Sequence, residues 1–148
     1  MSTIVLATDL TDVSAAAMGR AIDLAGRLCA RLLIVHVLDQ GRLSGRGNHD
    51  RVDQARAERE PLLMDLVRQA RGEGVDAEFL MWAGSASDGI AEAASSEGAE
   101  IIVVGTRRRR GAGRMILGSV SDRLIRTTRL PVLVVPTDGA IAGGRPRG

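Results

Sequence analysis

Lysine and tyrosine are absent from this chain, and other aromatic residues are rare. All 20 basic residues are arginine, and one Trp and one Phe are the only aromatic side chains among 148 residues. Without lysine the chain cannot supply a Schiff base or the phosphate-binding Lys of a P-loop, so a P-loop NTPase is excluded. With so few rings to stack on bases, nucleic-acid binding is disfavoured.

Cysteine and long apolar segments are also scarce. Cys29 is the single cysteine, so no internal disulfide can form, and its helical context predicts a buried apolar side chain. No apolar run approaches the roughly 18 residues of a membrane span, and the first residues lack the pattern of a signal peptide. We therefore expect a cytoplasmic protein without a membrane partner.

Five short apolar runs alternate with helical patterns along the chain. Several of these runs are continuously apolar, as is typical of strands that are covered on both faces. Alternating strands and helices require right-handed crossovers between parallel strands, so the sequence predicts an α/β domain with helices on both faces of the sheet. The expected strands are residues 3–8, 32–38, 77–82, 100–105 and 131–136.

Three irregular stretches interrupt this alternation. Residues 40–50 are rich in Gly, Ser and Asn and are predicted to be flexible, and Pro61 is predicted to break or to start a helix. Residues 137–148 resemble a flexible tail. None of these stretches indicates a second domain, so the expected domain covers residues 1–136.

The longest connection after a predicted strand has the sequence GTRRRRGAGRMILGS, residues 105–119. In open α/β sheets, ligands bind beyond the carboxyl ends of the strands, where the strand order reverses. Glycines allow a close approach of the backbone, and a helix start offers free N–H groups to an anion. Gly105, Gly118 and Ser119 are therefore candidates for a phosphate site.

Several of these segments resemble the universal stress protein family over nearly the whole chain. The first strand is followed by Thr8 and Asp9, the second ends in His36 and Val37, and the chain closes with PVLVVP. Residues 105–119 are similar to the family's nucleotide loop G-x-x-G-x9-G-[ST], except that Arg108 replaces the middle glycine.

The resemblance implies a Rossmann-like, open five-stranded parallel sheet in the order 3-2-1-4-5, and a homodimer that pairs through residues 132–135. It also implies that the chain binds ATP or another adenine nucleotide, with or without Mg. By this resemblance the adenine would lie against Asp9 and Val37, and the ribose and phosphates against the loop and helix start. The implied phosphate-side residues are Gly105, Gly118, Ser119, Val120 and Ser121.

Each candidate also has a structural interpretation, and the sequence leaves both open. Asp9 could be a ligand contact or a turn residue, with Asp12 as a helix cap. Ser119 and Asp122 have the spacing of a capping box, although a cap hydroxyl can also bind phosphate. The run Arg107 to Arg110 could be a solvated surface, a patch for nucleic acid or acidic partners, or a phosphate clamp in which Arg108 offsets the lost glycine.

The sequence offers neither a general base beside a nucleophile nor a set of metal ligands. We therefore expect a nucleotide-binding module of the stress response, with little or no hydrolysis. The alternative is a nucleotide-independent dimeric interaction protein, in which Arg108 impairs the pocket.

Overall fold

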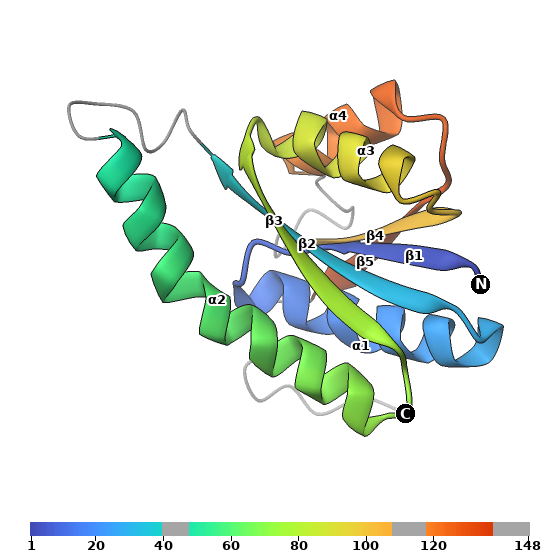
Figure 1. Cartoon of the computed structure of the whole chain (residues 1–148). Coiled ribbons are helices and arrows are strands. Elements are labelled where there is room, and N and C mark those ends of the chain that lie inside the picture. The colour runs from blue at the N-terminus through green and yellow to red at the C-terminus, as the bar shows by residue number, and fades with distance from the viewer. Residues whose placement is uncertain (40–47, 108–117, 138–148) are drawn as a thin grey trace, which may run out of the picture.

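The structure, a computed structural model, describes residues 1–39, 48–107 and 118–137. Within these ranges, five parallel strands form one sheet in the order β3-β2-β1-β4-β5, which confirms the predicted fold class and strand order (Figure 1). The elements are β1 (Thr3–Ala7), α1 (Asp12–Leu28), β2 (Arg31–Asp39), α2 (Asn48–Gly72), β3 (Ala77–Gly84), α3 (Ala86–Ser96), β4 (Ile101–Arg107), α4 (Ser119–Thr127) and β5 (Val132–Thr137).

Helices cover both faces of the sheet: α1 and α2 lie on one face, and α3 and α4 on the other (Figure 1). Side chains alternate along a strand, so Ile4 and Leu6 of β1 pack with α1 and α2, whereas Val5 and Ala7 pack toward α3 and α4. The continuous apolar pattern of β1 therefore has the predicted cause, because each face of the strand lies in its own hydrophobic cluster.

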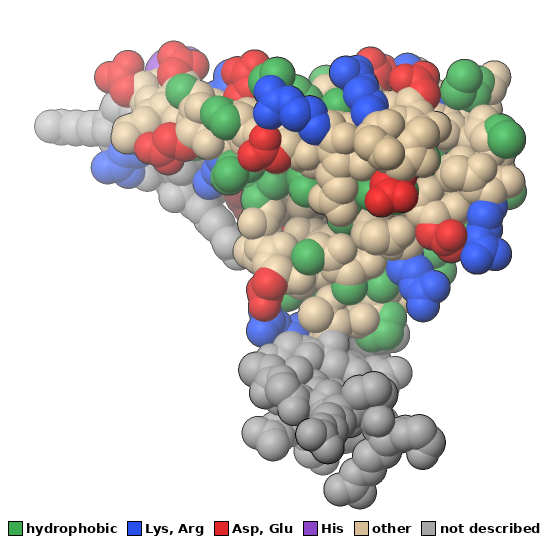
Figure 2. Space-filling view, turned by 90° about the horizontal axis from the view of Figure 1, so that it is seen from below, with side chains coloured by type: hydrophobic (Ala, Val, Ile, Leu, Met, Phe, Trp, Pro, Cys, Tyr) green, Lys and Arg blue, Asp and Glu red, His purple; other side chains and the backbone are tan. Residues whose placement is uncertain are grey.

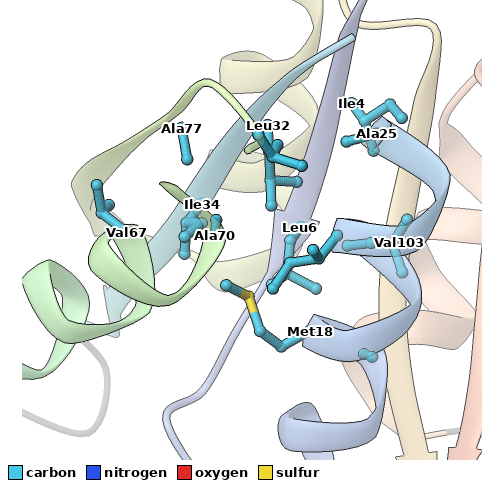
Figure 3. Packing of buried hydrophobic residues seen from close by; sticks show 14 of the residues in the cluster. Ile4, Leu6, Met18, Ala25, Leu32, Ile34, Val67, Ala70, Ala77 and Val103 are labelled. Carbon is cyan, nitrogen blue, oxygen red and sulfur yellow. The ribbon is translucent and has the colours of Figure 1, made fainter. Parts of the chain in front are cut away.

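The cluster under α1 and α2 is built from aliphatic side chains of several elements. Met18 of α1 and Val67 of α2 lie with Leu6 and Ile34 of the two central strands (Figure 3). Leu6 and Ile34 have no exposed surface. Burial of such side chains stabilises the fold by about 1.5–3 kcal/mol each, so this core holds β1 and β2, and the loops that follow them, in place.

The prediction that Pro61 breaks or starts a helix is wrong, because α2 runs without interruption from Asn48 to Gly72. Proline inside a helix removes one backbone hydrogen bond. Ala55 before Pro61 and Leu63 after it are both buried, and their burial compensates for that loss. Of the stretch predicted to be flexible, residues 40–50, the part from Asn48 onward belongs to α2. The rest, residues 40–47, lies outside the described residues.

The prediction of a buried Cys29 is also wrong, since this side chain is exposed. Cys29 caps the carboxyl end of α1 with a φ of 50°, a left-handed conformation that ends many helices. This turn directs the next residue, Ala30, into the core, where it is 4% exposed.

The carboxyl-terminal strand includes Thr137, which the sequence analysis assigned to the tail. Its hydroxyl donates a hydrogen bond to the carbonyl oxygen of Val13 at 3.0 Å and so ties β5 to the start of α1. The rest of the expected tail, residues 138–148, lies outside the described part of the chain.

The described surface mixes charges of both signs. Figure 2 views the molecule from below Figure 1, the side on which α1 lies, and shows Arg side chains interspersed with Asp and Glu. No helix among the described residues is both long and apolar enough to span a membrane.

Candidate functional site

A cavity of about 340 Å³ opens at the carboxyl ends of β1, β2 and β4. The strand order reverses at this position, because β1 lies between β2 on one side and β4 on the other. The helix after β1, α1, and the helix after β4, α4, lie on opposite faces of the sheet, so the helices diverge there and a crevice remains, as is general for open parallel sheets. The first turns of α1, α3 and α4 border the cavity, and α2 contributes one side chain, that of Arg59.

The cavity brings together five of the eight candidates from the sequence. These lining residues are Asp9, Val37, Gly105, Val120 and Ser121. Gly118 and Ser119 lie at the start of α4, next to the cavity wall without lining it. Arg108 lies outside the described residues.

Asp9 organises the turn between β1 and α1. Its Oδ1 accepts hydrogen bonds from the backbone N–H of Thr11 at 2.9 Å and from the Thr11 hydroxyl at 2.6 Å. Leu10, between Asp9 and Thr11, adopts a φ of 63°. This value is uncommon for a residue other than glycine and often marks a functional turn. The turn interpretation of Asp9 is therefore correct for Oδ1. Its Oδ2 has no recorded partner among the described residues and is free for a ligand.

The protonation state of Asp9 follows from these contacts. Partial burial raises the pKa of Asp9, but the hydrogen bonds from Thr11 and Ser14 stabilise the charged form, so that the net pKa lies below the usual value. The cavity therefore contains an ionised carboxylate at neutral pH.

His36 lies under the cavity and is 4% exposed. Its Nδ1 is 2.8 Å from the carbonyl oxygen of Thr8, and a carbonyl only accepts hydrogen bonds, so Nδ1 carries the proton. Its Nε2 then accepts from the Arg59 guanidinium at 3.0 Å. Burial lowers the pKa of His36, the Thr8 carbonyl opposes this, and the charge of Arg59 adds to the lowering, so the ring is neutral at pH 7.

The start of α4 differs from the predicted capping box. Gly118 is the N-cap residue, Ser119 is already the first helical residue, and no side chain caps the helix. The first intrahelical bond runs from the backbone N–H of Asp122 to the carbonyl oxygen of Gly118, at 3.0 Å. A glycine N-cap has no side-chain oxygen to offer, so the helix start relies on its dipole and on other groups to satisfy its free N–H donors.

Ser121, in the first turn of α4, is a buried serine at the cavity. It is 5% exposed and lines the cavity. Within the residues that the structure describes, no hydrogen bond is recorded for its hydroxyl. Buried hydroxyls nearly always have a partner, so this one is a candidate ligand contact.

The arginine run is only partly described. Arg107 ends β4 and pairs with Asp12 in the first turn of α1, with a distance of 2.8 Å between Nη2 and Oδ1. Of the alternatives for this run, Arg107 therefore fits a surface residue that joins two elements. Arg108 to Arg110 lie outside the described residues.

Comparison with known proteins agrees with this geometry. The sequence pattern of the Universal stress protein family matches residues 1–136. The chain belongs to the universal stress protein family. Universal stress protein MJ0531 of Methanocaldococcus jannaschii is 32% identical over 136 residues, which is 89% of this chain and 80% of that protein.

Solved structures of universal stress proteins share this fold. A family member from Burkholderia pseudomallei is 28% identical, with a TM-score of 0.76 over 92% of this chain and 96% of its own. A universal stress protein in complex with cAMP is also 28% identical, with a TM-score of 0.69 over 93% of this chain and 98% of its own.

The structure gives two glycines of the family loop different explanations. A Cβ on Gly105 would stand 2.5 Å from the carbonyl oxygen of Val13, so β4 and α1 need a glycine here whether or not a ligand binds. A Cβ on Gly118 would meet no atom of the described residues within 4 Å. For Gly118, by contrast, contacts among the described residues give no steric reason for a glycine.

Sequence reasoning missed five polar residues of the cavity lining. They are Thr8, Ser14, His36, Asp39 and Arg59. His36 carried a signal, because a lone histidine in an apolar strand needs buried polar partners. Arg59 carried none, since it is one of many charged residues on a long helix. Among the described residues, no group of three His, Cys, Asp or Glu side chains could hold a metal ion.

Proposed function

We propose that this universal stress protein binds an adenine nucleotide in the cavity at the carboxyl ends of β1, β2 and β4, with ATP, with or without Mg, as the main candidate. The observation that carries the proposal is the buried hydroxyl of Ser121, which lines the cavity and lacks a recorded partner in the described chain. A relative with 28% identity was crystallised with cAMP, an adenine nucleotide. From its family membership we also propose a role in the stress response and a cytoplasmic location.

The residues present fit such a ligand. The cavity volume of about 340 Å³ lies within the range of roughly 300–1,000 Å³ that is usual for small-molecule sites. At one end, the start of α4 offers free N–H groups, the Ser121 hydroxyl and the space that the described residues leave open beside Gly118 to phosphates. At the other end, Oδ2 of Asp9 can accept a hydrogen bond from an exocyclic amine or a ribose hydroxyl.

The site favours binding over hydrolysis. The single histidine of the cavity lining uses both ring nitrogens, Nδ1 toward Thr8 and Nε2 toward Arg59, so neither is free to accept a proton from water. The low pKa of Asp9 makes its carboxylate a weak base. We accordingly propose little or no turnover of the bound nucleotide.

The test compares two serines that differ in position rather than in burial. Ser121 and Ser87 are each 5% exposed and each lie in the first turn of a helix, but only Ser121 lines the cavity. ATP is titrated calorimetrically, with and without Mg, into nucleotide-stripped wild type, Ser121→Ala and Ser87→Ala. We expect Ser121→Ala to weaken binding about tenfold, the effect of one hydrogen bond to a charged group, and Ser87→Ala to bind as wild type does.

A second variant addresses the backbone approach. Gly118→Val is compatible with the extended φ of −66° at this position and should fold normally, but its side chain would occupy the space assigned to phosphate. Gly19→Val is the matched control, because its Cβ also meets nothing within 4 Å but lies on α1. Equal ATP affinity in both glycine variants, or no binding by the wild type, would contradict the proposal.

The alternative is a nucleotide-independent dimeric interaction protein. The observation in its favour is that Gly105 is required by the contact with α1, so part of the nucleotide motif would persist without a nucleotide. Nucleic acid is not an expected partner in either case.

For both functions we propose a homodimer through residues 132–135. β5 is an edge strand, and Leu133 on it is 37% exposed; pairing with a second copy would cover both. Light scattering should show a dimer at micromolar concentration and a monomer for Leu133→Glu. A monomeric wild type would contradict this assignment.

A further inference from the structure

Arg59 is the one cationic side chain among the residues that line the described cavity. It comes from α2, the long helix that packs beside β2 and β3, and it reaches the cavity over the end of β2. Its Nη1 lies 3.0 Å from Nε2 of His36. This is the polar contact recorded for Arg59 in the described chain, and no carboxylate of that part forms an ion pair with it.

The hydrogen bond to His36 orients the guanidinium of Arg59 without neutralising its charge. Because Nδ1–H donates a hydrogen bond to the Thr8 carbonyl, Nε2 must be an acceptor, and this neutral acceptor does not offset the positive charge of Arg59. A guanidinium has five N–H donors in a fixed plane, and the bond to His36 uses one of them. The remaining donors are available to a molecule in the cavity.

The sheet order shows which end of a ligand Arg59 would meet. The start of α4 lies on the β4 side of β1, whereas His36 and Arg59 lie on the β2 side. A nucleotide whose phosphates lie at α4 therefore crosses over β1 and places its base toward β2. Val37, which also lines the cavity, lies next to His36 at this end.

We propose that Arg59 is a specificity-determining residue of this site, donating a hydrogen bond to an acceptor atom of a purine base, and that His36 is the positioning residue that holds its guanidinium. This proposal rests on the proposed nucleotide function. It adds that the β2 end of the cavity accepts a purine base. Oδ2 of Asp9 is an acceptor and Arg59 a donor, so the cavity matches a base edge that carries a donor beside an acceptor, as adenine does.

The experiment separates the base from the phosphates. Adenosine, ATP and inorganic triphosphate are each titrated into nucleotide-stripped wild type, Arg59→Met and Arg59→Lys. Arg59→Met keeps the apolar stem and removes the donors, and Arg56→Met is the control on the same helix, an exposed arginine outside the cavity lining. Thermal melting confirms that each variant is folded.

We expect Arg59→Met to weaken adenosine and ATP by the same factor, about tenfold, and to leave triphosphate binding unchanged. Arg59→Lys should restore only part of the loss, because a lysine lacks the planar fork. A loss for ATP and triphosphate but not for adenosine would assign Arg59 to the phosphates and overturn the proposal. Unchanged affinities in Arg59→Met would overturn it while leaving the nucleotide function intact, whereas a wild type that binds neither ATP nor adenosine would overturn both.

The role of His36 is tested by a double-mutant cycle on adenosine affinity. His36→Leu removes the acceptor, and we expect it to lose as much affinity as Arg59→Met, with no further loss in the double variant. His36→Gln retains an acceptor near Nε2 and should recover part of the affinity. Additive losses would show that His36 acts independently of Arg59, and a lower melting temperature without any loss of affinity would show that His36 is only structural; either result would overturn its positioning role.

Discussion

Gly105 and Val13 lie so close that a Cβ on Gly105 would stand 2.5 Å from the carbonyl oxygen of Val13. The same carbonyl oxygen accepts a hydrogen bond from the Thr137 hydroxyl, with 3.0 Å between the two oxygens. β4, β5 and α1 therefore meet at this point beside the cavity. Neither backbone can yield without disturbing these contacts.

Gly105→Ala should therefore destabilise the protein by about 1–3 kcal/mol, the usual cost of overpacking. Gly118→Ala should change the free energy of unfolding by less than about 1 kcal/mol, since its Cβ meets open space in the described structure. Urea unfolding of both variants gives the comparison. Equal stabilities would contradict the close approach between β4 and α1.

Asp9→Asn should separate the two roles of Asp9. The amide oxygen can still accept from Thr11, so we expect the variant to lose no more than about 1 kcal/mol of stability. The NH2 group that replaces one oxygen cannot accept from a ligand, so ATP affinity should fall about tenfold. Asp9→Ala, by contrast, should lower both stability and affinity. Normal affinity in Asp9→Asn would restrict Asp9 to its role in the turn.

The pH dependence of stability should report on His36. Its pKa is lower in the folded protein than in the unfolded chain, so the unfolded chain binds a proton first as the pH falls. The contribution of the neutral ring is thus present above about pH 6.5 and is lost below it.

Urea unfolding between pH 8 and 5 measures this effect. His36→Gln should reduce the decline in stability at the acidic end. The same change at the exposed His49 is the control and should leave the decline as in the wild type. Identical pH profiles for His36→Gln and the wild type would contradict the lowered pKa of His36 in the folded protein.

The ion pair between Arg107 and Asp12 should contribute little. The side chains are 49% and 72% exposed, so solvent screens their attraction, and a double-mutant cycle should give a coupling of at most about 1 kcal/mol. Because Asp12 already pairs with Arg107, we expect Arg107→Gln to leave ATP affinity unchanged at 0.15 M salt. A strong loss of affinity would restore the phosphate-clamp interpretation for this residue.

The strands and the position of the cavity could be predicted from the sequence because they depend on local patterns. Continuous apolar runs such as residues 32–38 occur where both faces of a strand are covered. Alternation with helices then requires a parallel sheet, and the order taken from the family resemblance has its switch point at β1 and β4. Asp9 follows β1, and the family resemblance implied Val37 near the end of β2, so both could be assigned to the cavity before any coordinates.

The interactions that only the tertiary structure decided link residues far apart in the chain. Pro61 remains within a helix because burial of Ala55 and Leu63 outweighs one lost hydrogen bond. Gly105 is explained by the approach of α1, and Arg59 faces the cavity because β2 places His36 beneath α2. Local patterns therefore determined the elements and their order, while side-chain contacts across elements determined the chemistry of the site, because such contacts depend on three-dimensional packing that no local pattern encodes.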